Sequence, residues 1–135
     1  MVNESSVLFL CVHNAGRSQI GAGWMRHLGG ETIQAYSAGS TPAEQVNPMV
    51  VKAMAEVGID LTNQKPTKWT EDMIKEVDVV ISMGCGDTCP VYPNKSYINW
   101  EIDDPSGQEI ETVRTVRDQI EKLVRELLVK LLGKE

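Results

Sequence analysis

Apolar residues recur along this chain with two different periods, which predict strands and helices in alternation. Residues 7–12 form an unbroken apolar run and residues 77–83 a nearly continuous one, as in strands that are covered on both faces. Residues 32–37 and 96–102 are interpreted as two shorter strands. The pattern therefore predicts four strands.

Apolar residues at helical spacing occupy most of the segments between and after these strands. Asn47 followed by Pro48 is typical of a helix start, because asparagine caps free N–H groups and proline suits the first helical position. Gly21 and Gly23 lie inside the first helix, where glycine is unfavourable, so we expect them to permit close approach of a neighbouring element. The predicted helices begin at Ser18, Asn47, Thr70 and Glu111, and glycines at 29–30, 58 and 133 end three of them.

Strands that alternate with helices predict an α/β fold with a parallel, doubly wound sheet. A chain of 135 residues is long enough to bury a core as one domain, and no linker or repeat interrupts it. We therefore expect a single domain over residues 1–135.

Composition and charge exclude several classes of partner. A net charge of −6 argues against nucleic acid, which requires a basic surface. No stretch approaches the ~18 apolar residues of a membrane span, and the first residues do not have the pattern of a signal peptide. Three cysteines, an odd number without an export signal, favour thiol chemistry in a reducing compartment. We expect a cytoplasmic monomer that binds neither nucleic acid nor membranes.

The segment between the first strand and the first helix carries the pattern C-x5-R-S. A loop of this kind presents free backbone N–H groups and the positive end of a helix dipole to an anion. Cys11 would be stabilised there as a thiolate, Arg17 offers a planar fork for tetrahedral oxyanions, and Ser18 supplies a hydroxyl. A buried packing cysteine and a surface arginine are the plain alternative for each residue alone. The residues expected to bind the anion are Val12, His13, Asn14, Ala15, Gly16 and Arg17.

The loop Cys11–Ser18 resembles the phosphate-binding loop of the low-molecular-weight protein tyrosine phosphatase superfamily. The continuation Gln19-Ile20, the segment Tyr36-Ser37-Ala38-Gly39 and the late Asp103-Asp104-Pro105 are similar to the arsenate reductases of that superfamily. The resemblance covers about residues 6–132. It implies the strand order 2-1-3-4, with helices on both faces of the sheet.

Two further cysteines, Cys85 and Cys89, follow the third strand directly, so parallel geometry places them at the same edge of the sheet as Cys11. A zinc half-site is one interpretation, but the spacing is C-x3-C without a second pair. A redox pair and two unrelated loop cysteines are the others. The adjacent glycines favour a loop that must bend, and a disulfide between these cysteines is within reach.

In the arsenate reductases that this chain resembles, the three thiols form a relay. The resemblance implies that Cys11 attacks arsenate while Asp104 protonates the departing oxygen. Cys85 then attacks the cysteine–arsenic adduct and releases arsenite, and Cys89 resolves the resulting disulfide. Without the resemblance, Asp104 before Pro105 could equally well initiate a turn.

The resemblance also bears on cofactors and reductants. No bound cofactor or metal is expected, and an external thiol system would reset the enzyme, either thioredoxin or mycothiol with a glutaredoxin-like redoxin. The short spacing of the last two cysteines is similar to the mycothiol-dependent relatives. Some relatives hold potassium near the loop; here Ala22 aligns with their glutamate and Lys68 lies near their aspartate, so the Lys68 ammonium is a candidate to replace that ion.

Two other functions are compatible with the sequence. A phosphatase would share Cys11, Arg17, Ser18 and Asp104 and would need no other thiol. However, Ser106-Gly107 stand where tyrosine phosphatases carry aromatic residues that flank the substrate ring. A non-enzymatic binding protein that responds to redox state or to anions is the third possibility.

Overall fold

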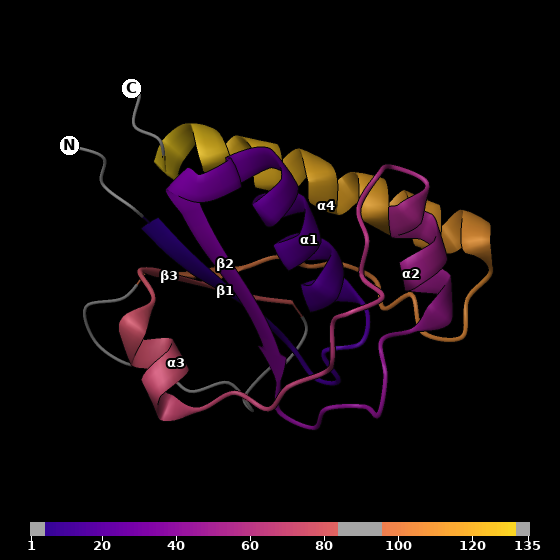
Figure 1. The fold of residues 1–135 in the computed structure, drawn as a ribbon, viewed down its shortest axis with the longest axis horizontal. Coiled ribbons are helices and arrows are strands. Elements are labelled where there is room, and N and C mark those ends of the chain that lie inside the picture. Colours follow the sequence, from indigo (N-terminus) through magenta and orange to yellow (C-terminus); the bar gives the residue numbers. More distant parts are fainter. Residues whose placement is uncertain (1–4, 84–95, 132–135) are drawn as a thin grey trace.

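A computed structural model describes residues 5–83 and 96–131, and its centre is a four-stranded parallel sheet (Figure 1). The strands lie in the order β2-β1-β3-β4, so the expected order 2-1-3-4 is confirmed. Their bounds are β1 Ser5–Cys11, β2 Ile33–Gly39, β3 Val79–Ser82 and β4 Ser96–Asn99. The helices are α1 Arg17–Gly29, α2 Pro48–Ala55, α3 Glu71–Glu76 and α4 Ile110–Leu131, with a short 3-10 turn at Gly30–Thr32.

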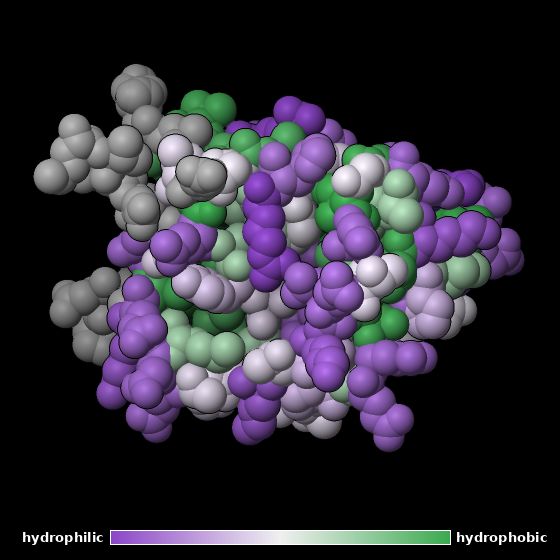
Figure 2. All heavy atoms as spheres, viewed as in Figure 1, coloured by the Kyte–Doolittle hydropathy of each residue, from purple (hydrophilic) through white to green (hydrophobic). Residues whose placement is uncertain are grey.

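The sheet separates two apolar cores because side chains alternate along β1. Val7, Phe9 and Cys11 belong to the larger core, beneath α1, α2 and α4. Leu8 and Leu10 belong to the smaller core on the opposite face, which α3 covers. Figure 1 shows these two helical layers on either side of the strands, as the fold prediction requires. The face shown in Figure 2 is largely hydrophilic, with apolar residues interspersed.

The predicted strand boundaries differ from those in the structure, because backbone pairing rather than apolar character determines where a strand begins and ends. Within the apolar run 77–83 the strand itself covers only β3, although Val77 and Met83 are buried and the Met83 amide still donates to the Leu10 carbonyl at 2.8 Å. The last strand stops at Asn99, short of the predicted 102. The helix starts agree closely: Asn47 Oδ1 accepts a hydrogen bond from the Met49 amide, and Thr70 Oγ1 accepts one from the Met73 amide.

The end of α2 is fixed to α4 by charge. Glu56 accepts hydrogen bonds from Arg114 at 2.7 Å and from Arg117 at 2.9 Å. The hydrogen bond from Arg114 is the main cause that lowers the pKa of Glu56 to about 2. Because the first residues of α2 form one wall of the pocket described below, this pairing holds that wall against the body of the protein.

The prediction for the helix glycines is confirmed most clearly at Gly21. A Cβ atom there would lie 2.6 Å from Cδ1 of the buried Phe9 ring, closer than carbon atoms approach. Gly23 has more room, since its nearest neighbour would be the flexible end of Met54 at 3.2 Å.

We therefore expect Gly21→Ala to destabilise the protein by about 1–3 kcal/mol through overpacking, despite the better helix propensity of alanine. Urea unfolding measures the change. Gly23→Ala is the matched control and should be close to neutral. If the two variants unfold alike, close contact with Phe9 is not the reason for glycine at position 21.

Candidate active site

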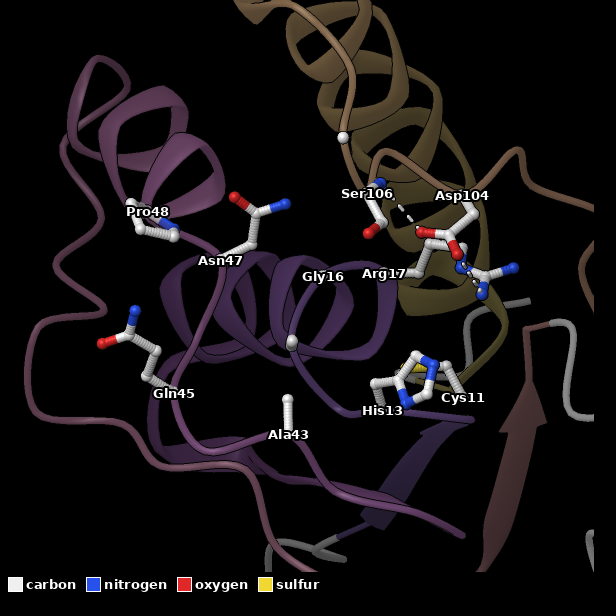
Figure 3. A pocket seen from close by; sticks show the side chains of 12 residues that line it. Cys11, His13, Gly16, Arg17, Ala43, Gln45, Asn47, Pro48, Asp104 and Ser106 are labelled. Carbon is white, nitrogen blue, oxygen red and sulfur yellow. Dashed lines mark hydrogen bonds and ion pairs between the residues drawn. The ribbon is translucent and has the colours of Figure 1, made fainter.

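The candidate site is a pocket of about 360 Å³ at the carboxyl end of β1, where the chain turns into α1 (Figure 3). This is the edge at which parallel sheets of this type bind ligands. Cys11 is the last residue of β1 and Arg17 the first of α1, so both ends of the predicted loop are confirmed. The residues that line the pocket are Cys11, His13, Ala15, Gly16, Arg17, Ala43, Gln45, Asn47, Pro48, Asp104, Ser106 and Gly107.

The backbone of the loop is oriented by hydrogen bonds to every carbonyl group from residue 12 to residue 16. The carbonyl oxygens of Val12, His13 and Ala15 accept hydrogen bonds from the amides of residues 41, 43 and 47, at 2.8 to 3.0 Å. The Asn14 carbonyl accepts from the Gln19 side chain, and the Gly16 carbonyl accepts from the Ile20 amide. A carbonyl and the next amide point in opposite directions across a peptide plane, so the N–H groups of the loop are left to face an anion.

Gly39 permits this arrangement at the end of β2. A Cβ atom at position 39 would lie 2.6 Å from the Val12 carbonyl oxygen and 3.0 Å from the Asn14 amide nitrogen. Any larger residue would therefore push the loop away from β2. This explains the glycine that ends the Ser-Ala-Gly segment.

Asn14 positions the hydroxyl group that contacts the cysteine sulfur. Its Oδ1 accepts a hydrogen bond from the Thr67 amide at 2.8 Å, which can only donate, so its Nδ2 faces Ser18 Oγ at 2.6 Å. Ser18 Oγ thus accepts a hydrogen bond from Asn14 and lies 2.9 Å from Cys11 Sγ; because a thiolate can only accept, Ser18 donates to the sulfur when Cys11 is ionised. All three side chains are buried, and a hydroxyl that donates to sulfur stabilises the thiolate.

Asn14 also adopts a left-handed backbone conformation, with φ of 52°, which asparagine tolerates better than most residues. Its side chain points into the protein interior, where it bonds to Thr67 and Ser18. Asn14 could therefore contact an anion only through its backbone. Val12, also predicted in the binding loop, packs its side chain against the smaller core.

Arg17 and Asp104 meet at the mouth of the pocket. Arg17 Nη1 donates to the Ile102 carbonyl at 3.2 Å, and Nη2 lies 3.6 Å from Asp104 Oδ2. The Arg17 side chain is only 11% exposed, whereas that of Asp104 is 50% exposed, so the carboxyl group is accessible from solvent. Asp104 Oδ1 also accepts a hydrogen bond from the Ser106 amide, so this residue does form the turn that was the plain alternative.

The pocket contains residues that the sequence pattern did not single out. Gln45 and Asn47 come from the segment after β2, whereas Ser106, whose position beside the substrate the resemblance had implied, comes from the loop before α4. Only the Asn47-Pro48 helix start gave a signal there, and it indicated a cap rather than a pocket wall. Cys85 and Cys89 lie outside the residues that the structure describes, so the geometry of the relay stays a prediction.

The observed position of Lys68 gives its ammonium two partners. Nζ donates to the Ser40 carbonyl at 3.2 Å and lies 5.2 Å from the centre of the Trp69 ring, while Ala22 is fully buried in α1. Replacement of a potassium ion by Lys68 stays a prediction. Within residues 5–83 and 96–131, no cluster of three or more His, Cys, Asp or Glu side chains could hold a metal ion. Among the described helices, none is long and apolar enough to cross a membrane.

We expect Ser18→Ala to slow alkylation of Cys11 at neutral pH by about tenfold or more, because a hydrogen bond to a charged group contributes roughly 1.5–3 kcal/mol. Peptide mass spectrometry after timed treatment with iodoacetamide measures this reaction at Cys11 alone. Ser82→Ala is the control, since the Ser82 hydroxyl bonds to Asn99 instead. Equal alkylation rates in all three proteins would show that the Ser18 hydroxyl does not stabilise the thiolate.

Comparison with known proteins places this geometry in a family. The family model described as low molecular weight phosphotyrosine protein phosphatase matches residues 6–135. An arsenate reductase from Halalkalibacterium halodurans is 37% identical over 134 residues, which cover 92% of this chain and 95% of that protein.

Solved structures agree with the sequence comparison. A thioredoxin-dependent arsenate reductase from Corynebacterium glutamicum superposes with a TM-score of 0.85 at 39% identity, covering 96% of this chain but 62% of the longer one. A structure described as an arsenate reductase in the phosphate binding state superposes with a TM-score of 0.81 at 34% identity, covering 93% of this chain and 98% of that one.

Proposed function

The chain belongs to the low molecular weight phosphotyrosine protein phosphatase family, and from its similarity to the arsenate reductases there we propose that it reduces arsenate to arsenite. One arrangement supports the proposal: Cys11 Sγ lies 2.9 Å from the Ser18 hydroxyl, in a loop whose carbonyl groups are hydrogen-bonded to the protein, with Arg17 and Asp104 at the mouth of the pocket. Such an enzyme serves arsenic detoxification.

In the first step the Cys11 thiolate attacks arsenic and forms a sulfur–arsenic bond. The loop amides and the Arg17 guanidinium stabilise the negative oxygens as the arsenic centre becomes crowded. Asp104 donates a proton to the departing oxygen, which leaves as water. The Ser106 amide, at 2.9 Å, and the Arg17 guanidinium, at 3.6 Å, position the Asp104 carboxyl group at the mouth of the pocket, where that oxygen would leave.

In the second step a thiol attacks Cys11 Sγ. A sulfur–sulfur bond forms, the sulfur–arsenic bond breaks, and its electron pair stays on arsenic, which leaves as arsenite after taking up the thiol proton. We assign this thiol to Cys85 and the resolving thiol to Cys89, because exchange proceeds through whichever thiolate reaches the sulfur. An external reductant then opens the last disulfide.

We propose thioredoxin, or mycothiol with a glutaredoxin-like redoxin, as that reductant. The Corynebacterium protein described above is thioredoxin-dependent, which supports a disulfide reductant of this class. We further propose that the protein acts in the cytoplasm, since the cytoplasm supplies both reducing systems, and that it is a monomer.

A single assay separates the candidate functions. The protein is given arsenate with a thiol reductant and, in parallel, p-nitrophenyl phosphate, and the remaining free thiols are counted. A reductase consumes thiols in proportion to arsenate. A phosphatase releases phosphate and consumes none, and a binding protein does neither; either result would refute arsenate reduction.

Phosphatase activity is the second candidate, because the Cys11 loop, Arg17 and Asp104 suffice for phosphate ester hydrolysis without another thiol. We expect Cys85→Ser and Cys89→Ser to keep p-nitrophenyl phosphate hydrolysis near the wild-type rate. With thioredoxin as sole reductant, Cys89→Ser should stall with Cys11 and Cys85 joined, which mass spectrometry detects. Loss of hydrolysis in a folded Cys89→Ser protein would contradict the view that the thiol relay is separate from the anion-binding loop.

A further inference from the structure

The pocket is much larger than the anion that its inner end would hold. Its volume is about 360 Å³, whereas an oxyanion of five heavy atoms fills the space of only a few waters of roughly 30 Å³ each. When the anion lies at Cys11 and Arg17, the outer part of the pocket is left for a second group. This part, the outer pocket, is lined by Ala43, Gln45, Asn47, Pro48, Ser106 and Gly107 (Figure 3).

Hydrogen-bonding groups of the outer pocket are available to a ligand. Asn47 Oδ1 accepts from the Met49 amide at 2.9 Å, so the Asn47 NH2 group is turned away from α2. Figure 3 shows the Asn47 side chain extending toward the side of the pocket where Ser106 lies. Three side-chain groups of the outer pocket have no hydrogen-bond partner within the part of the chain that the structure describes. They are the Asn47 NH2 group, the Gln45 side-chain amide and the Ser106 hydroxyl.

His13 adds an acceptor whose position is fixed. Its Nδ1 lies 3.0 Å from the Thr41 carbonyl oxygen, which can only accept, so Nδ1 carries a proton. In the neutral ring Nε2 is then an acceptor, and His13 lines the same pocket. Donors from amides together with an acceptor match hydroxyl groups, which both donate and accept.

The charge of the lining and its side-chain types restrict the class of ligand further. Apart from His13, the ionisable groups that line the pocket are Cys11, Arg17 and Asp104, which belong to the proposed chemistry. The outer pocket is therefore neutral. No phenylalanine, tyrosine or tryptophan is among the described residues of the lining, so the six residues of the outer pocket offer no aromatic side chain to stack on a ring.

We propose that the outer pocket binds a neutral, non-aromatic organic group rich in hydroxyls. That group is part of one of two ligands. The first is a phosphate ester, and the second is a small thiol that attacks Cys11 Sγ in the Cys11–arsenic adduct, as in the second step given above. The thiol alternative rests on the proposed arsenate reduction, whereas the ester alternative requires only the anion cradle.

The ester arm measures inhibition of p-nitrophenyl phosphate hydrolysis by glycerol phosphate, phenyl phosphate and inorganic phosphate. Glycerol phosphate should bind more tightly than the other two. The inhibition constant of glycerol phosphate, divided by that of inorganic phosphate, should rise about threefold to tenfold in each of three variants, Gln45→Ala, Asn47→Ser and Ser106→Ala. Serine keeps the helix cap at position 47 while removing the amide, and Gln64→Ala is a control outside this pocket.

The thiol arm uses a Cys85→Ser background, in which an external thiol must attack the adduct. Arsenate-dependent oxidation of thioglycerol is compared with that of propanethiol, each rate being expressed per thiolate. Thioglycerol should react at least severalfold faster, and the same three substitutions should remove that preference.

A preference in either arm that depends on the three residues supports the outer pocket and identifies what carries the hydroxyl group. No preference in either arm, or preferences that the substitutions leave unchanged in folded variants, overturns it. If the wild-type protein, with Cys85 present and thioredoxin supplied, oxidises no thiol with arsenate while the ester arm shows the preference, arsenate reduction fails and the outer pocket stands.

Discussion

Cys11→Ser should abolish arsenate-dependent thiol oxidation and p-nitrophenyl phosphate hydrolysis together. Both reactions begin with attack by the Cys11 sulfur, and among the described residues the hydrogen-bond partner of that sulfur is the Ser18 hydroxyl, which is not a base that could activate a serine. The Ser18 hydroxyl lies 2.9 Å from Cys11 Sγ, so it donates to the sulfur when the thiolate forms. Serine is nearly the same size, so the buried loop should stay folded.

The control is ligand binding by the same variant. Cys11→Ser should still bind inorganic phosphate, measured by calorimetry, because the amides and Arg17 remain. Cys85→Ser and Cys89→Ser serve as matched cysteine substitutions and should keep hydrolysis. Either activity at near the wild-type rate in Cys11→Ser would remove Cys11 from the mechanism.

Asp104→Asn should lower p-nitrophenyl phosphate hydrolysis by the ~10²–10⁴ typical of a lost general acid. Asparagine retains the oxygen that accepts from the Ser106 amide, so the turn is preserved while the proton is lost. The loss should be greater for phenyl phosphate, since phenoxide is a poorer leaving group than nitrophenoxide and depends more on protonation.

Asp103→Asn is the matched control, because this neighbouring carboxylate is exposed and does not line the pocket. It should retain nearly full hydrolysis of both esters. Equal losses in the two variants, or a loss in Asp104→Asn that is the same for both leaving groups, would assign Asp104 to the turn and to Arg17 alone.

The strand–loop–helix unit of the site could be predicted because its signals are local. The apolar run before Cys11 and the helical period after Ser18 both lie within a few residues of the chemistry, and both boundaries are confirmed. The strand order is a different matter, since periodicity does not specify which strands pair. That order was implied by the resemblance and is confirmed.

The outer wall of the pocket could not be predicted in the same way. Gln45 and Asn47 reach the site because the segment after β2 donates its amides to the loop carbonyls, including Asn47 N to Ala15 O at 2.9 Å. Such contacts between distant backbone groups leave no period in the sequence. The inward turn of Asn14 was missed for a similar reason, because its partner Thr67 is 53 residues away.

Hydrogen exchange can report whether the loop of residues 12–16 keeps its conformation, because the carbonyl groups of this loop accept hydrogen bonds from backbone amides elsewhere in the chain. The amides of Thr41, Ala43 and Asn47 each donate to one of those carbonyls, at 2.8, 3.0 and 2.9 Å. Their deuterium exchange therefore follows opening of the cradle itself rather than unfolding of the sheet. These bonds join protein groups only, so they hold the loop backbone without a contribution from the anion. Anion binding then requires little ordering of the backbone, and most of its interaction energy is available to hold the substrate.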